Sequence, residues 1–184
     1  MMQIDKGDML IAEPFMLDPN FKRAAVLIVD HEDDLGSVGF VLNKKSPYKI
    51  EELLDDIGDF EGDVYYGGPV ANNILHFLHN VGDMVEDSLG ICRGVYWGGD
   101  FTAFKFLMAQ GLIKPENVRF FLGYSGWSPH QLSDEIKEGS WIIEEMDSNY
   151  LFKTDPENLW KVILQSKGEA YSALSQIDGD YINN

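Results

Sequence analysis

The residues best suited to nucleophilic chemistry lie in the run GYSGW at positions 123–127. Its serine, Ser125, is placed as in the Gly-x-Ser-x-Gly turn that exposes the nucleophile of many hydrolases, but the last position is tryptophan instead of glycine. A hydrolase also needs a histidine and an acid that the fold brings close, and the chain offers His31, His79 and His130. The incomplete motif therefore disfavours Ser125 as a nucleophile.

Metal chemistry has two weak candidates. His76 and His79 are three residues apart, so they share a face on a helix but point to opposite sides of a strand, and segment 74–79 fits either state. The run DHEDDLG at positions 30–36 spaces carboxylates as a calcium loop does, yet its sixth and twelfth positions hold leucine and valine instead of glycine and glutamate. No spacing indicates a third ligand for the histidines, so no metal site is predicted.

Thiol and phosphate chemistry are also disfavoured. The chain has one cysteine, Cys92, which excludes an internal disulfide and a thiolate-rich zinc site. Its strand-like surroundings predict an inert core thiol. Neither the P-loop pattern nor the glycine-rich dinucleotide-binding pattern occurs in the chain. The sequence therefore predicts no cofactor.

A groove is the remaining candidate site. Trp127 is followed by Gln131 and Glu135, which are four residues apart and therefore lie on one face of a helix. The functional interpretation is a groove lined by the tryptophan, with the two polar side chains as hydrogen-bonding groups. The structural alternative is that Gln131 completes a capping box, Glu135 lies on the surface and Trp127 packs in the core.

The elements that must position these groups are mostly strands in the first half of the chain and helices later. Apolar runs bounded by glycine, proline or polar residues predict strands over Met9–Ala12, Ala24–Val29, Gly36–Leu42, Asp63–Tyr66, Ile74–His79, Leu89–Trp97, Asn117–Tyr124 and Ser140–Ile143. Capping residues and apolar stripes predict helices from Ser46 to Gly58, Asp100 to Gly111, Ser128 to Gly139 and Asp155 to Leu164, with a weaker helix over Glu169–Leu174. Strands and helices do not alternate strictly, which favours an α+β fold.

Length and charge limit the classes to which the protein can belong. The 184 residues suit one domain over 1–184, with 178–184 expected to fray, and no apolar run is long enough to span a membrane. With 14 Lys+Arg against 31 Asp+Glu, the net charge is −17, and the densest basic groups are pairs of residues. Nucleic-acid binding needs larger basic clusters, so direct DNA binding is disfavoured. Without a visible secretion signal, we expect a soluble cytoplasmic protein.

Several motifs occur in order along nearly the whole chain. They are GDMLIAEP at 7–14, DPNF at 18–21 with His31, Gly36 to Asn43, GGPV at 67–70, and RFFLGYSGW at 119–127, followed by QL at 131–132, EI at 135–136 and GSW at 139–141. In these motifs the chain resembles the YqgE/AlgH family of bacterial proteins. It departs from the family at Lys44-Lys45, where Arg-Pro is usual, and at Ser125, where alanine is usual. The second departure further disfavours a serine nucleophile.

The resemblance implies an α+β fold in which a bifurcated, strongly curved β-sheet forms a pseudo-barrel with helices packed against it. It implies no particular reaction. AlgH is named as a transcriptional regulator. The resemblance nevertheless implies a family without a settled biochemical activity.

Three functions are open, in order of preference. The first is a non-catalytic binding or regulatory protein that acts through a protein partner or a small ligand, because no catalytic set is complete. The second is an enzyme of unrecognised type with a hydrolase-like pocket, whose ligand-binding candidates are His31, Asn43, His79, Trp127, Gln131 and Glu135. The third is a regulator that binds DNA directly, suggested only by the family name. No catalytic residue is assigned.

Overall fold

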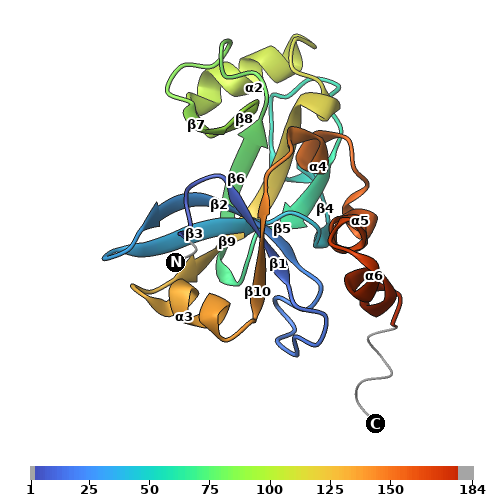
Figure 1. Ribbon diagram of the computed structural model, residues 1–184. Helices are drawn as coiled ribbons and strands as arrows, with labels where there is room; N and C mark the ends of the chain where they lie inside the picture. Colours follow the sequence, from blue (N-terminus) through green and yellow to red (C-terminus); the bar gives the residue numbers. More distant parts are fainter. Residues whose placement is uncertain (1–2, 178–184) are drawn as a thin grey trace.

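A computed structural model gives the fold and describes residues 3–177 (Figure 1). The strands are β1 (Asp8–Ala12), β2 (Ala25–Glu32), β3 (Gly36–Val41), β4 (Lys45–Lys49), β5 (Asp63–Tyr66), β6 (Val70–His79), β7 (Leu89–Cys92), β8 (Val95–Trp97), β9 (Val118–Trp127) and β10 (Trp141–Glu145). The helices are α1 (Ile50–Leu53), α2 (Phe101–Ala109), α3 (Gln131–Lys137), α4 (Ser148–Phe152), α5 (Pro156–Ser166) and α6 (Glu169–Ser175), with a 3₁₀ helix at Pro115–Asn117. The expected frayed end, 178–184, lies outside the described residues.

The strands form one strongly curled sheet that divides at β9. Its main order is β10-β1-β2-β3-β9-β6-β8-β7, and neighbours along this path are antiparallel. The short pair β4–β5 joins through a parallel pairing of β5 with β9. Residues 120–122 of β9 pair with β5, whereas residues 125–127 pair with β3. The predicted α+β fold with a bifurcated, strongly curved sheet is therefore confirmed.

Glycines make this division of the sheet possible. Gly123 lies on β9 between the two pairing segments with a φ of +71°. A Cβ at this position would lie 2.7 Å from the carbonyl oxygen of Gly68 and 2.8 Å from that of Val70. A Cβ on Gly67 would lie 2.3 Å from the carbonyl oxygen of Gly123. Real Cβ atoms do not approach backbone so closely, so glycine is needed where these chain segments meet.

Helices cover the sheet at three places (Figure 1). α5 packs on one face of β1 and β2, where the indole Nε1 of Trp160 donates to the Ala12 carbonyl oxygen at 2.9 Å. α3 contributes Leu132 to a cluster on the other face of these strands. α2 contributes Phe104 to a third cluster with β6 and β9. None of the helices in residues 3–177 is long and apolar enough to cross a membrane.

Local signals predicted two helix starts correctly. α2 begins after Asp100, whose carboxylate accepts a hydrogen bond from the Ala103 N–H at 3.0 Å. α5 begins after Asp155, which accepts from the Glu157 N–H at 3.2 Å. These caps depend only on residues within one turn, which is why the sequence is sufficient to find them.

The helix predicted from Ser46 to Gly58 is wrong. Residues Lys45–Lys49 form β4 against β5, and only Ile50–Leu53 are helical. The Ser46 hydroxyl donates to the carbonyl oxygen of Val64 at 2.7 Å instead of capping a helix. Pairing with β5 therefore overrides a local helix signal, as tertiary contacts often do.

Two further boundaries differ from the prediction. The single strand expected over Leu89–Trp97 is a hairpin, because β7 and β8 turn back on each other around Gly94. The helix expected to start after Ser128 instead begins at Gln131, with His130 as its N-cap. The Gln131 Oε1 still accepts from the Ser128 N–H at 3.0 Å, which is half of the expected capping box.

Candidate functional site

A carboxylate joined to two tryptophans lies at the centre of the expected groove region. One oxygen of Glu135 accepts from the indole Nε1 of Trp127 at 3.0 Å and from that of Trp141 at 2.8 Å. The other oxygen accepts from the Gln131 amide at 2.9 Å. Both oxygens are thus engaged by neighbouring side chains. We refer to Trp127, Gln131, Glu135 and Trp141 as the tryptophan–carboxylate cluster.

Two strands and one helix bring this cluster together. Trp127 ends β9, Trp141 begins β10, and α3 between them carries the two polar residues. The tryptophans are only 5% and 3% exposed, and the Phe21 ring packs against both indoles. Sequence reasoning missed Trp141, although the run GSW at 139–141 was the available signal.

A serine, a histidine and an aspartate form a second group of contacting polar side chains. The His31 Nδ1 lies 2.8 Å from the Ser37 hydroxyl oxygen, and its Nε2 lies 3.2 Å from a carboxylate oxygen of Asp33. A bulge after Ile28 sets His31 opposite Ser37 in the β2–β3 hairpin. Ser37 is 6% exposed, whereas the Asp33 side chain is 80% exposed. Sequence reasoning named His31 but missed Ser37, although Ser37 lies within the motif from Gly36 to Asn43.

The other two candidate residues lie elsewhere. The Asn43 Oδ1 accepts from the Ala25 N–H at 2.9 Å, and its Nδ2 donates to the Arg23 carbonyl oxygen at 2.8 Å. This side chain therefore ties the end of β3 to the start of β2. His79 is buried at the end of β6 and lies against Phe104 of α2. No recorded contact in residues 3–177 links either side chain to the tryptophan–carboxylate cluster.

His79 is a buried, hydrogen-bonded imidazole. Its Nε2 donates to the Gly98 carbonyl oxygen at 2.7 Å, and its Nδ1 accepts from the Val81 N–H at 3.3 Å. Burial lowers the pKa of His79, and the hydrogen bond to Gly98 only partly opposes this shift. Burial also lowers the pKa of His76, which lies on the opposite side of β6. Both imidazoles therefore favour the neutral form more strongly in the folded protein than in the unfolded chain.

We expect the free energy of unfolding to decrease as the pH falls below about 6.5. The unfolded chain takes up protons at the ordinary histidine pKa while the folded protein does not, so acid favours unfolding by at most about 1.4 kcal/mol per pH unit for each such histidine. Urea unfolding at about pH 7.5 and about pH 5.5 measures this loss. It should be smaller in His79→Gln and unchanged in His130→Gln, which alters an exposed histidine. Equal losses in both variants would show that His79 is not responsible.

An open groove of about 470 Å³ lies along β2, β3 and the end of β9. Asp30 is paired with Val38 and Val38 with Gly126, so these residues follow one another across the sheet. Trp127 borders the same groove, so the groove lies beside the tryptophan–carboxylate cluster. Two carboxylates and several apolar or aromatic side chains make its walls: Asp30, Glu32, Leu35, Val38, Val70 and Tyr124. We call this feature the hairpin groove.

Comparison with known proteins gives the family. The family model described as AlgH-like matches residues 9–172. The chain belongs to the AlgH-like family. Among its relatives, a "UPF0301 protein" of Cytophaga hutchinsonii is 41% identical over 173 residues, which cover 94% of each chain. Another, from Chlorobaculum parvum, is 40% identical over 169 residues, covering 92% of this chain and 90% of the relative.

Two solved structures resemble this AlgH-like protein. The solution structure of the AlgH protein from Pseudomonas aeruginosa matches with a TM-score of 0.72 and 28% identity, covering 97% of this chain and 99% of that one. A crystal structure of a protein from Corynebacterium diphtheriae has a TM-score of 0.80 and 17% identity, covering 96% and 94%. The second likeness concerns the fold alone. No specific molecular function accompanies the family assignment.

Proposed function

We propose that this AlgH-like protein is a non-catalytic binding protein whose hairpin groove takes a basic, partly apolar segment of a protein partner. The observation that carries the proposal is that side chains able to do chemistry are engaged in holding the fold together. The hairpin groove, which lies beside the tryptophan–carboxylate cluster, is open, and its charge and apolar surface suit such a segment.

Three candidate reactive groups have structural partners. Both oxygens of Glu135 accept hydrogen bonds within the tryptophan–carboxylate cluster. Ser125 is fully buried, and its hydroxyl donates to the Gly67 carbonyl oxygen at 3.1 Å. His79 is fully buried, with hydrogen bonds at both ring nitrogens. A catalytic acid, base or nucleophile must reach its substrate, so these contacts support binding over catalysis.

The walls of the hairpin groove favour a basic segment. Asp30 and Glu32 are exposed carboxylates on β2. Leu35 at the hairpin tip is 73% exposed, and Val70 on β6 is 39% exposed. Lysine and arginine combine an apolar stem with a cationic head, so they match both kinds of surface. The net charge of −17 also attracts basic segments during encounter.

Titration of isotope-labelled protein with a short peptide of alternating lysine and leucine, followed by NMR, tests the proposal. We expect saturable amide shifts around the hairpin groove. Combining Asp30→Asn with Glu32→Gln should weaken binding roughly tenfold, because two exposed ion pairs together contribute roughly 1.4 kcal/mol. Leu35→Ser should also weaken binding, since it removes apolar contact area.

A matched pair of substitutions separates the groove from the net charge. Asp55→Asn with Asp59→Asn removes the same charge at exposed positions outside the groove lining and should leave the affinity unchanged. A peptide of alternating glutamate and leucine should not bind. If both pairs of substitutions weakened binding equally, the attraction would be to net charge alone and the proposal would be wrong.

One observation favours an enzyme as the second candidate. His31 lies between the Ser37 hydroxyl and the Asp33 carboxylate, which is the order of groups that activates a serine in hydrolases. The burial of Ser37 opposes this function, because substrate must reach the nucleophile. We expect a fluorophosphonate probe to leave the protein unlabelled in intact-mass measurements. Labelling that disappears in Ser37→Ala would overturn the non-catalytic proposal.

Direct DNA binding is the third candidate, and its test is separate. It requires duplex binding that weakens steeply with salt, because phosphate contacts release counterions. We expect no mobility shift of a DNA duplex even at low salt, since carboxylates line the hairpin groove and the net charge is −17. A salt-sensitive shift would favour the DNA-binding function over a protein partner.

A further inference from the structure

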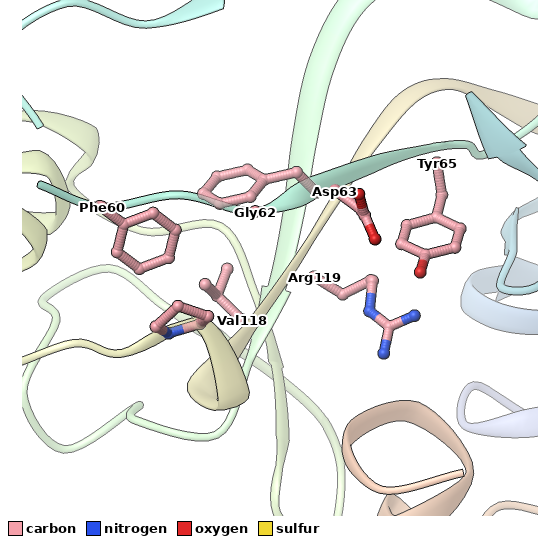
Figure 2. A pocket seen from close by; sticks show the side chains of 8 residues that line it. Phe60, Gly62, Asp63, Tyr65, Val118 and Arg119 are labelled. Atoms are coloured by element: carbon pink, nitrogen blue, oxygen red, sulfur yellow. The ribbon is translucent and has the colours of Figure 1, made fainter. Parts of the chain in front are cut away.

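A second cavity, of about 240 Å³, lies between β5, β9 and the loops that precede them. Figure 2 shows two kinds of wall: Phe60 and Val118 lie on one side, and Asp63, Tyr65 and Arg119 lie on the other. The cavity is therefore apolar at one end and charged at the other. It is small for a ligand pocket, so it suits a ligand of about one ring.

Arg119 is a partly buried guanidinium with few partners. Its Nη2 donates to the Leu151 carbonyl oxygen at 2.8 Å, and its central carbon lies 4.5 Å from the centre of the Tyr65 ring. None of the ion pairs recorded in residues 3–177 includes Arg119. Burial lowers the pKa of Arg119, which reflects the cost of keeping the charge away from water. Asp63 and Asp155 act on Arg119 through their charge but form no direct ion pair with it, so its remaining N–H groups are available to an anion.

The unused donors at this end of the cavity remain accessible. In residues 3–177, the Nε2 of His76 is the only buried side-chain nitrogen or oxygen without a hydrogen-bond partner. The remaining N–H groups of Arg119 and the hydroxyl of Tyr65 are therefore not enclosed by protein. A guanidinium fork and a phenol hydroxyl together can bind one carboxylate through charge-assisted hydrogen bonds.

The nearest carboxylate in the cavity wall is already paired with other cations. Asp63 is paired with Lys45 at 2.9 Å and with Lys49. The hydrogen bond from Lys49 lowers the pKa of Asp63, so this carboxyl is ionised and neutralised by its neighbours. Asp155 also acts on Arg119 through its charge, and the Glu51 carboxylate accepts from the Gly62 N–H in the cavity wall at 3.1 Å. Because Asp63 is already paired with two lysines, it leaves Arg119 without a direct ion pair.

We infer that this cavity binds a small organic anion, with Arg119 and Tyr65 holding its carboxylate and Phe60, Val118 and Phe120 packing against its apolar body. The site lies outside the hairpin groove and shares no lining residue with it. The inference is therefore independent of the proposed protein partner.

Benzoate serves as the probe in an NMR titration of the whole protein. We expect saturable shifts at Tyr65, Val118 and Arg119, with a Kd of roughly 1 to 10 mM for so small a ligand. Arg119→Lys keeps the charge but loses the bidentate fork, so affinity should fall about tenfold. Tyr65→Phe keeps the stacked ring and loses the hydroxyl, and should weaken binding about threefold.

Two controls make the outcome decisive. Arg93→Lys is the same change at an exposed arginine and should leave benzoate affinity unaltered. Benzylamine, which has a similar body and the opposite charge, should not shift the same residues. Shifts that never saturate, equal affinities in Arg119→Lys and Arg93→Lys, or benzylamine binding at these residues would each overturn the inference. The lysine–leucine peptide should not compete with benzoate, so the two proposals fail separately.

Discussion

Replacing Glu135 by alanine is expected to lower the free energy of unfolding by about 3 to 5 kcal/mol. The change leaves the indole N–H groups of Trp127 and Trp141 without their acceptor, at side chains only 5% and 3% exposed. Each buried donor that loses its partner costs about 1 to 3 kcal/mol, and the truncated side chain also leaves a gap against the indoles. Urea unfolding followed by tryptophan fluorescence measures the loss.

Two matched variants show whether the cluster is responsible. Glu138→Ala removes an exposed carboxylate from the end of the same helix and should change stability by no more than about 0.5 kcal/mol. Glu135→Gln keeps one acceptor oxygen, so its loss of stability should lie between those of Glu135→Ala and Glu138→Ala. A Glu135→Ala protein as stable as Glu138→Ala would mean that the carboxylate does not hold the indoles.

Gly123→Ala is expected to destabilise the protein by about 3 to 5 kcal/mol. The new Cβ would lie 2.7 Å from the Gly68 carbonyl oxygen, so the backbone must move at the point where the sheet divides. The φ of +71° adds strain, because L-residues pay about 1 to 2 kcal/mol in the left-handed region. The loss of stability is measured from the midpoint and the slope of urea unfolding.

Gly111 provides the control for this substitution. Its φ is +70°, nearly the same as that of Gly123, but nothing lies within 4 Å of a Cβ built there. Gly111→Ala should therefore cost only the backbone strain, about 1 to 2 kcal/mol. If both variants lost the same stability, close packing at the division of the sheet would contribute nothing.

Helix caps and buried strands could be predicted from the sequence because their causes are local. Asp100 and Asp155 cap helices through N–H groups within one turn. Ser46 gives the same kind of signal, yet its hydroxyl is used by Val64, eighteen residues away in sequence. A residue's local preference and its tertiary partner compete, and sequence reasoning without the fold sees only the first.

The candidate site shows the same limit. Helical spacing is enough to place Gln131 and Glu135 together on α3. The contact of Glu135 with Trp141 needs β10 to return beside the helix, and no spacing rule predicts that. The pairing of His31 with Ser37 depends on one bulge in the β2–β3 hairpin, since a shift of one residue would turn the side chains to opposite faces.

We infer that the tryptophan–carboxylate cluster serves structure and keeps the Glu135 carboxylate from acting on a ligand. Hydrogen exchange at the indole Nε1–H groups of Trp127 and Trp141, followed by NMR, is the measurement that tests this inference. We expect slow exchange at both indoles in the native protein and in Glu138→Ala, with rapid exchange in Glu135→Ala. Rapid exchange at both indoles in the native protein would contradict it, because Glu135 would then be free to act on a ligand.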